Sequence, residues 1–167
     1  MENGKIKLTL TEDTRNKPDK HSIKHHHWAA EGVALIRSKL AFGDYALPPV
    51  VSIDTKASIQ ELASNVFNEH ERFRRELVGA RDAGCLLVVL TENLHGISSL
   101  ADLAAWREPA AEFAKRRHAQ RRIEGARLAK ACATMQRKYG ARFEFCAPDE
   151  SARRIVEILM TEGREHG

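Results

Sequence analysis

The sequence predicts a single α/β domain in which helices cover both faces of a central sheet. Strand patterns and helix patterns alternate along the chain, as they do in α/β folds. "CLLVVL", from Cys85 to Leu90, is an unbroken apolar run of strand length, typical of a central strand that is buried on both faces. The length of 167 residues suits one domain with its own hydrophobic core, so we expect residues 1–167 to form a single domain.

The first two elements are a strand and a short helix. "KIKLTL", from Lys5 to Leu10, alternates apolar and polar residues, which predicts a half-buried strand. "TEDTR" follows and puts Asp13 and Arg15 at the carboxyl end of that strand. After a polar stretch, the spacing of apolar residues predicts a helix from about His26 to Arg37.

Two strands and a long helix come next. The region from Ser38 to Thr55 is interpreted as two strands, with the turn or a strand edge at the "PP" that begins at Pro48, because two prolines cannot both lie in a central ladder. Apolar residues at three- and four-residue steps then predict an amphipathic helix that runs to about Val78. Its start has a capping-box pattern, with Ser58 as the N-cap and Glu61 three residues later.

The part of the chain from about residue 97 is predicted to be basic and helical. A short helix covers Ser98 to Trp106, and a long basic helix covers about Pro109 to Tyr139, with Gly140 as its end. "RFEFCA" is a further strand. A final helix opens at a cap-like Asp149 or Ser151.

Composition restricts the class of protein. Apolar residues make up 43% of the chain and charged residues 30%, so the chain is neither disordered nor membrane-like. The N-terminal sequence has no signal-peptide pattern, and no segment approaches the ~20 apolar residues of a membrane span, so we expect a cytoplasmic protein with no membrane partner. The three cysteines, Cys85, Cys132 and Cys146, are widely spaced among apolar residues and are expected to be reduced and mostly buried.

The basic residues are unevenly distributed. The net charge is +4, and the segment from Arg107 to Lys138 holds ten Lys or Arg against three Glu. This excess favours a polyanionic partner, with contacts mainly to the phosphates of DNA. A solvated helix face is the alternative explanation. The candidate DNA-binding residues are Lys115, Arg116, Arg117, Arg121 and Arg122.

"FGDYALPPVVSIDTK", from Phe42 to Lys56, contains two aspartates and a lysine at a suggestive spacing. Mg²⁺ prefers oxygen ligands and is usually held by one or two carboxylates together with substrate phosphates. Asp44 and Asp54, on or beside neighbouring strands, supply two carboxylates, and the Thr55 carbonyl is a candidate third ligand. Lys56 lies two residues after Asp54 and so points to the same face, where it can stabilise charge on the phosphate and position or deprotonate water. An exposed hairpin that carries surface charges is the alternative.

The same region resembles the core of the XPF-type branch of the PD-(D/E)XK nucleases. "GDY", which begins at Gly43, matches the family's first block. Asp54, Thr55 and Lys56 stand where the family has Glu-Arg-Lys, so the carboxylate and the lysine are kept and the arginine is replaced. The likeness covers about residues 5–93 and depends on order and spacing more than on identity.

The resemblance also implies a set of auxiliary residues. "LTEDTR" is similar to the family's strand that ends in Asp-x-Arg, which makes Asp13 an auxiliary metal-ligand candidate and places Arg15 beside the site. An N-terminal loop ion pair is the alternative for these two residues. Glu61 lies one residue later than the family's Asp-Leu position. Arg72 and Glu76 stand where the family has Arg and Gln and are implied to face the cleft, with a surface salt bridge as the alternative.

The implied fold is restriction-endonuclease-like, with a mixed central sheet flanked by helices. The implied function is a DNA endonuclease that uses Mg²⁺ or Mn²⁺ and acts on branched or otherwise structured DNA, in a setting such as repair, recombination or a mobile element. The oligomeric state is open, with a homodimer as one candidate. Two alternatives stand beside this: a non-catalytic DNA-binding or scaffold module, and a small-molecule α/β enzyme or regulatory protein in which Asp44 and Asp54 are plain surface residues.

A run of histidines suggests a further candidate. His21 and "HHHW", which begins at His25, contain ligand-type side chains, but consecutive histidines on a helix point in different directions and no cysteine is near in sequence. A solvated or phosphate-facing helix start is therefore favoured over a zinc site, and a substrate contact by one of the histidines stays open.

Overall fold

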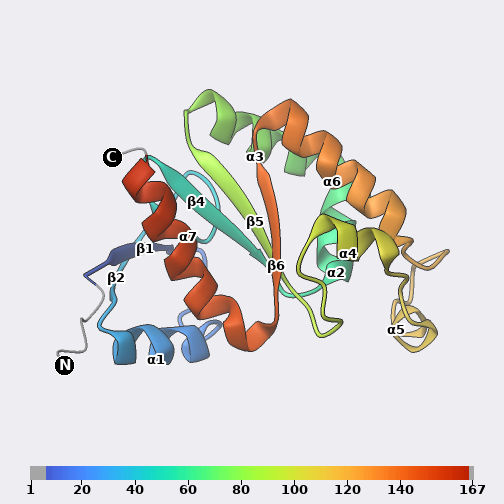
Figure 1. Ribbon diagram of the computed structural model, residues 1–167, viewed down its shortest axis with the longest axis horizontal. Helices are drawn as coiled ribbons and strands as arrows, with labels where there is room; N and C mark the ends of the chain where they lie inside the picture. Colours follow the sequence, from blue (N-terminus) through green and yellow to red (C-terminus); the bar gives the residue numbers. More distant parts are fainter. Residues whose placement is uncertain (1–6, 166–167) are drawn as a thin grey trace.

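In a computed structural model that describes residues 7–165, the six strands of this region form one mixed sheet (Figure 1). The strand order is β2-β1-β3-β4-β5-β6. β3 pairs antiparallel with both β1 and β4, while β1 and β2 are parallel, and β4, β5 and β6 are parallel. The strands are β1 (Thr9–Asp13), β2 (Ala34–Ser38), β3 (Tyr45–Leu47), β4 (Val51–Lys56), β5 (Leu86–Glu92) and β6 (Arg142–Cys146).

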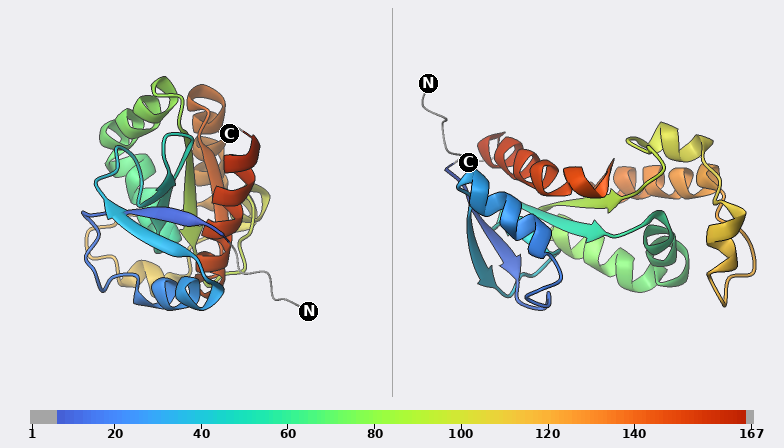
Figure 2. Two further views of the ribbon diagram at one scale, coloured as in Figure 1. Left: turned by 90° about the vertical axis from the view of Figure 1, so that its left-hand side faces the viewer. Right: turned by 90° about the horizontal axis from the view of Figure 1, so that it is seen from below.

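Helices cover both faces of the sheet, which confirms the predicted fold class. Figure 2 shows α7 and α3 on opposite sides of the strands. The helical elements are α1 (Ser22–Glu31), α2 (Ile59–Ala63), the π-helical turn η1 (Ser64–Asn68), α3 (His70–Asp82), α4 (Leu100–Ala105), α5 (Ala110–Ala114), α6 (Gly125–Tyr139), the 3₁₀ turn η2 (Pro148–Glu150) and α7 (Ser151–Glu165).

The central strand β5 divides the core into two clusters. Leu87 and Val89 pack with residues of α2, α3, α4 and α6, whereas Val88 and Leu90 pack with α1 and α7. All four side chains are at most 1% exposed. Successive residues of a strand point to opposite faces, so the apolar run contributes side chains to both clusters in turn. The prediction of a central strand buried on both faces is confirmed.

The N-terminal elements differ from their predicted bounds. Lys5 and Ile6 lie outside the described residues, and β1 runs from Thr9 to Asp13. The helix predicted over residues 26–37 is wrong, because the helix ends at Gly32 and β2 follows it. Gly32 has a left-handed conformation with φ of 80°, and its N–H donates to the Ala29 carbonyl, so it is a C-cap that reverses the chain into a strand.

Both predicted long helices are interrupted. The helix expected over residues 58–78 is divided into α2, η1 and α3, and the π turn is closed by the Glu69 N–H, which donates to the Ser64 carbonyl at 2.9 Å. The basic helix expected over residues 109–139 is divided into α5, a loop over residues 115–124, and α6. At the start of α6, a Cβ on Gly125 would lie 1.9 Å from the Leu103 carbonyl oxygen. The start of α6 is therefore packed against α4.

Several local signals are confirmed. Ser58 caps α2 by accepting a hydrogen bond from the Glu61 N–H, and Gly140 ends α6 with φ of 66°. The turn between β3 and β4 lies at Pro48 and Pro49. All three cysteines are free thiols, of which Cys132 and Cys146 are buried and Cys85 is half-buried.

Over residues 7–165, no helix has both the length and the apolar character needed to cross a membrane.

Candidate active site

Gly43 places Asp44 against the edge of β4. Gly43 has φ of +71°, and a Cβ on it would lie only 2.6 Å from the Ile53 carbonyl oxygen, so only glycine fits. The next residue, Asp44, donates its N–H to the Ile53 carbonyl at 2.7 Å and accepts a hydrogen bond on its own carbonyl from the Asp13 N–H at 2.8 Å. The segment before β3 is thus fixed between β1 and β4.

The Asp44 carboxylate is anchored by Thr55. The Thr55 N–H and hydroxyl both donate to Oδ2 of Asp44, at 2.8 and 2.7 Å. Among the partners found within residues 7–165, none donates to the other carboxylate oxygen, Oδ1. Carbonyls two residues apart in a strand point the same way, so the Thr55 carbonyl is directed, like that of Ile53, toward the edge of β4 where Asp44 lies.

Asp54 and Lys56 form a buried ion pair on one face of β4. Their residues are 8% and 7% exposed, and Nζ of Lys56 lies 2.8 Å from Oδ2 of Asp54. The Lys56 ammonium also donates to Oδ1 of Asn65 at 3.2 Å and lies 5.7 Å from the centre of the Phe73 ring. The spacing of two residues along β4 therefore brings these two side chains together, as the sequence predicted.

The electrostatics of the pair depend on burial and on neighbouring carboxylates. Burial raises the pKa of Asp54, the Glu76 and Asp44 carboxylates raise it further, and Lys56 opposes the shift. Burial lowers the pKa of Lys56, but the Asp54 carboxylate more than offsets this and the net shift is upward. Lys56 is therefore an ammonium at neutral pH, which favours charge stabilisation over proton abstraction. The carboxylates that raise the pKa of Asp54 form an environment that favours a bound cation.

Glu76 reaches the same region from α3. Its Oε1 accepts a hydrogen bond from the Gly43 N–H at 3.3 Å, next to the segment that holds Asp44. Arg72 does not join it: its guanidinium pairs with Glu69, and the Arg72 side chain is 67% exposed. The Arg72–Glu69 pair takes the place of the Arg72–Glu76 salt bridge that was the alternative for these residues.

Asn65 is a site residue that sequence reasoning missed. It is 6% exposed, and its Nδ2 donates to the Glu61 carbonyl at 2.9 Å while its Oδ1 faces Lys56. The π-helical turn η1 supplies this position, because such a turn widens the helix and is frequent at functional sites. One signal was available, namely a polar residue three positions after Leu62, where the apolar stripe would continue.

The other auxiliary residues have local partners. The Asp13 carboxylate pairs with Nε of Arg15 at 2.5 Å and accepts a hydrogen bond from the Leu40 N–H at 3.3 Å, which makes a loop ion pair at the end of β1. Glu61 accepts a hydrogen bond from the Ala57 N–H at 2.7 Å and belongs to the cap of α2.

The histidines at α1 differ in burial: His21, at the N-cap, is buried, His25 and His27 are half-buried, and His26 is exposed. His25 lies 2.5 Å from Oε2 of the fully buried Glu12, and the His21 ring packs against Tyr45. Burial lowers the pKa of His21. Within residues 7–165, no group of three or more His, Cys, Asp or Glu side chains is arranged to hold a metal ion. A metal at the candidate site would therefore combine two aspartates with a carbonyl, water and substrate phosphate, a donor set that suits Mg²⁺.

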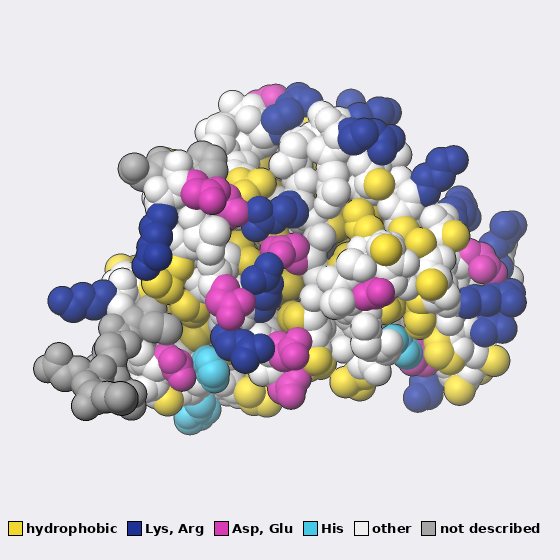
Figure 3. Space-filling model, in the orientation of Figure 1, with side chains coloured by type: hydrophobic (Ala, Val, Ile, Leu, Met, Phe, Trp, Pro, Cys, Tyr) yellow, Lys and Arg dark blue, Asp and Glu magenta, His cyan; other side chains and the backbone are white. Residues whose placement is uncertain are grey.

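The candidate DNA-binding residues divide into two groups. Arg116 forms two close contacts with the buried Glu108, at 2.7 and 2.5 Å, and Arg122 donates to the Glu108 carbonyl at 2.6 Å. These two arginines hold the loop together. The side chains of Lys115, Arg117 and Arg121 lie on the surface of the same loop region, at the end of the molecule where Lys and Arg gather in Figure 3.

Solved structures with a similar fold include two of XPF from Aeropyrum pernix. XPF from Aeropyrum pernix has a TM-score of 0.63 and 20% sequence identity, over 93% of this chain and 65% of that chain. XPF from Aeropyrum pernix in complex with DNA has a TM-score of 0.62 and 17% identity, over 95% of this chain and 66% of that chain. The chain thus spans just under two thirds of the length of these proteins.

The similarity establishes an XPF-type fold. It confirms the fold that the "GDY" and "DTK" motifs implied. No protein-family model and no curated protein sequence matches the chain.

Proposed function

We propose that this protein is a divalent-metal-dependent DNA endonuclease that hydrolyses phosphodiester bonds in branched or otherwise structured DNA. The observation that supports it best is the buried Asp54–Lys56 ion pair beside an Asp44 carboxylate that Thr55 holds in place. The XPF-type fold agrees with this activity, and one protein of the same fold is known in complex with DNA.

Asp44, Asp54 and the Thr55 carbonyl are the residues that would hold Mg²⁺ or Mn²⁺. When bound there, the ion would supply a Lewis acid for the phosphate and a water of lowered pKa. Thr55 keeps one Asp44 oxygen occupied and so limits the rotation of the carboxylate. Asp54 must be ionised to act as a ligand, and its raised pKa makes this a function of pH.

Lys56 would stabilise the negative charge that develops on the phosphate. Its ammonium is held by Asp54 on one side and by Asn65 on another, so its position is fixed before substrate binds. Both partners are buried, which limits the side-chain entropy that would be lost on forming the transition state.

Lys115, Arg117 and Arg121 would contact the DNA backbone. Such contacts are independent of sequence, and they weaken steeply as salt is raised because counterions are released on binding. Arg116 and Arg122 would act indirectly, by holding the loop through Glu108.

A cleavage assay tests the proposed activity. Wild-type protein with Mg²⁺ or Mn²⁺ should cut branched or single-stranded DNA, and Asp54→Asn should not. Asp82→Asn is the matched control, since Asp82 is 63% exposed at the end of α3 and pairs with Arg81. Cleavage by Asp54→Asn at the wild-type rate would refute the proposed role of Asp54.

A second candidate is a non-catalytic DNA-binding module. It is favoured because, among residues 7–165, no group of three or more His, Cys, Asp or Glu side chains is arranged to hold a metal ion. Salt-sensitive DNA binding by the wild type, without cleavage of any substrate in Mg²⁺ or Mn²⁺, would select this candidate.

A further inference from the structure

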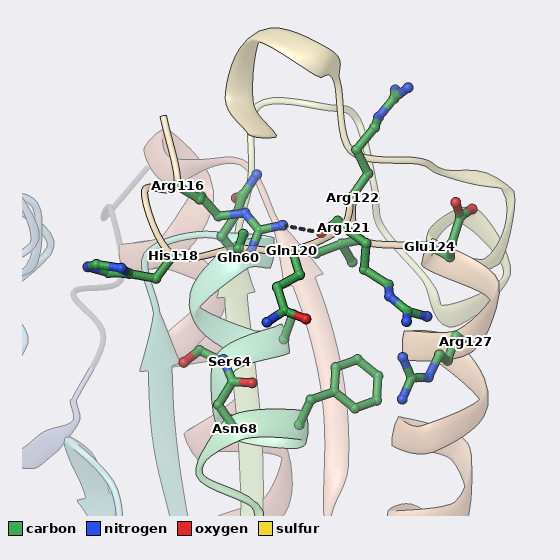
Figure 4. Close-up of a pocket in the computed structure, with 14 residues that line it drawn as sticks. Gln60, Ser64, Asn68, Arg116, His118, Gln120, Arg121, Arg122, Glu124 and Arg127 are labelled. Carbon is green, nitrogen blue, oxygen red and sulfur yellow. Dashed lines mark hydrogen bonds between the residues drawn. The ribbon is translucent and has the colours of Figure 1, made fainter. Parts of the chain in front are cut away.

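A cavity of about 540 Å³ lies between the helical stretch α2–η1 and the loop of residues 115–124. Figure 4 shows it open between these two walls, with the start of α6 beside it. Its volume is in the range of small-ligand sites, roughly 300–1,000 Å³, and is large enough for one nucleotide. It is a different region from the Asp54–Lys56 pair.

The loop wall is held by a buried carboxylate. Glu108 is fully buried, and its two oxygens accept hydrogen bonds from the Arg116 guanidinium and from the Ile123 N–H, the latter at 3.0 Å. Gln60, on α2, also donates to Glu108, at 3.3 Å, so the loop is tied to the opposite wall. The cavity is therefore preorganised by hydrogen bonds and does not depend on a ligand for its shape.

Two guanidinium groups at the cavity lack an acidic partner. Within residues 7–165, neither Arg121 nor Arg127 makes an ion pair. The Arg127 guanidinium lies 4.6 Å from the centre of the Phe67 ring. Figure 4 shows Arg121 and Arg127 directed toward the same space beside a ring. The neighbouring Glu124 is engaged elsewhere, with Arg107 at 2.8 Å. The cavity thus presents two positive charges that are not neutralised.

The remaining lining groups can form neutral hydrogen bonds. Figure 4 shows the Gln120 amide extending toward Ser64 and Asn68, across the cavity from Arg121. Two amides and a hydroxyl provide both donors and acceptors, as a nucleobase or a sugar requires. The positive charges of Arg121 and Arg127 on one side suit the phosphate of a nucleotide. The amide groups on the other side suit its base or its sugar.

The cavity shares a wall with the candidate active site. Ser64 and Asn68 line the cavity, while Asn65, between them in sequence, donates from Nδ2 to the helix and contacts Lys56 through Oδ1. The same helical turn therefore faces the cavity on one side and the catalytic lysine on the other. A DNA strand that has one phosphate at Lys56 can continue over this turn.

We propose that the cavity binds one nucleotide of an unpaired DNA strand, with its phosphate between Arg121 and Arg127. The proposal rests on the proposed function in that DNA is the ligand. The bases of a duplex are paired and stacked. A duplex nucleotide could therefore enter the cavity between α2–η1 and the loop only if it were extruded from the stack. A single strand has no such cost, and bases and phosphates can be held separately by polar groups and charges.

Binding of short oligothymidylates, followed by fluorescence anisotropy in EDTA, tests this without cleavage. Arg121→Gln and Arg127→Gln should each weaken single-strand binding about tenfold, a typical loss for one charge-assisted phosphate contact. Lys130→Gln is the matched control, because Lys130 is exposed on α6, three residues after Arg127, but does not line the cavity. It should weaken binding less than about threefold, and all three variants should affect a blunt duplex equally.

Two further arms complete the experiment. If the loss in Arg121→Gln depends on a 5′-phosphate on the probe, the cavity holds a terminal phosphate; if it does not, the cavity holds an internal phosphodiester. Equal losses for the three variants on single strands, or equal selective losses on the duplex, would overturn the proposal. Failure of the endonuclease function would appear instead as absent cleavage in Mg²⁺ with these binding differences intact.

Discussion

Thr55 donates two hydrogen bonds, from its N–H and its hydroxyl, to a single carboxylate oxygen of Asp44. The two residues are eleven positions apart in sequence, and β3 and the Pro48–Pro49 turn lie between them. In the resembling family an arginine stands at the Thr55 position. This chain instead uses the short side chain to fix the neighbouring carboxylate, so the replaced residue acquires a positioning role in the proposed site.

Thr55→Val should separate this role from packing. Valine keeps the shape and the N–H but removes the hydroxyl, so Asp44 loses one of its two donors. We expect cleavage to fall about tenfold and the free energy of unfolding to change by no more than about 1–2 kcal/mol. Thr55→Ser should restore cleavage. Wild-type rates in Thr55→Val would show that the hydroxyl does not position Asp44.

Asn65→Leu should destabilise the protein, because it removes the amide that holds Lys56 and leaves the Glu61 carbonyl without that donor. We expect a loss of roughly 1–3 kcal/mol in the free energy of unfolding, measured by urea denaturation. Asn68→Leu, on the exposed side of the same turn, is the control and should change stability by less than about 0.5 kcal/mol. Equal stabilities for the two variants would contradict a structural role for the Lys56–Asn65 contact.

The raised pKa of Asp54 predicts a pH dependence of metal binding. A proton competes with the metal for Asp54 at higher pH than for an ordinary aspartate, so Mn²⁺ affinity should rise as pH increases from about 5.5 to about 8. Glu76→Gln removes a carboxylate that raises this pKa and should shift the profile to lower pH. Carbon-detected NMR of the Asp54 carboxyl measures the pKa directly. Glu71→Gln, exposed on α3, should leave it unchanged, and an unshifted Asp54 in Glu76→Gln would contradict the electrostatic account.

Glu108→Gln should loosen the loop of residues 115–124. The variant keeps the size of the side chain but removes the charge that holds Arg116 and accepts from the Ile123 N–H. Since Glu108 is buried and the Arg116 side chain is 29% exposed, we expect a stability loss of about 2–3 kcal/mol, below that of a fully buried pair. Limited trypsin digestion should cut within the loop faster than in the wild type. Unchanged digestion would show that Glu108 does not order the loop.

The sequence predicted the elements whose signals are local. Period-two spacing placed Asp54 and Lys56 on one face of β4, the apolar run identified β5, and Ser58 and Gly140 marked helix ends. Such features depend on neighbours within a few residues of the sequence. The predictions based on them therefore agree with the structure.

The elements that differ depend on contacts distant in sequence. The sequence of residues 115–124 predicts a helix because its residues are good helix formers. In the structure Glu108 binds Arg116 of this segment, and Gly125, directly after it, packs closely against Leu103. These tertiary contacts override the local propensity. Asn65 was missed because its burial depends on Lys56, nine residues earlier on a strand. The family pattern implies a cleft position for Arg72 but not its pairing with Glu69, three positions earlier.

The single-turnover cleavage rate of Lys56→Ala in Mg²⁺, on branched DNA, tests the central claim most directly. Lys138→Ala, on the exposed end of α6, is the control, with circular dichroism and DNA affinity verifying that each variant is folded. We expect wild type and Lys138→Ala to cut at similar rates, and Lys56→Ala to be slower by at least about a hundredfold, the effect of removing one preorganised charge. Cleavage by Lys56→Ala at the wild-type rate, or no cleavage by the wild type despite DNA binding, would contradict it.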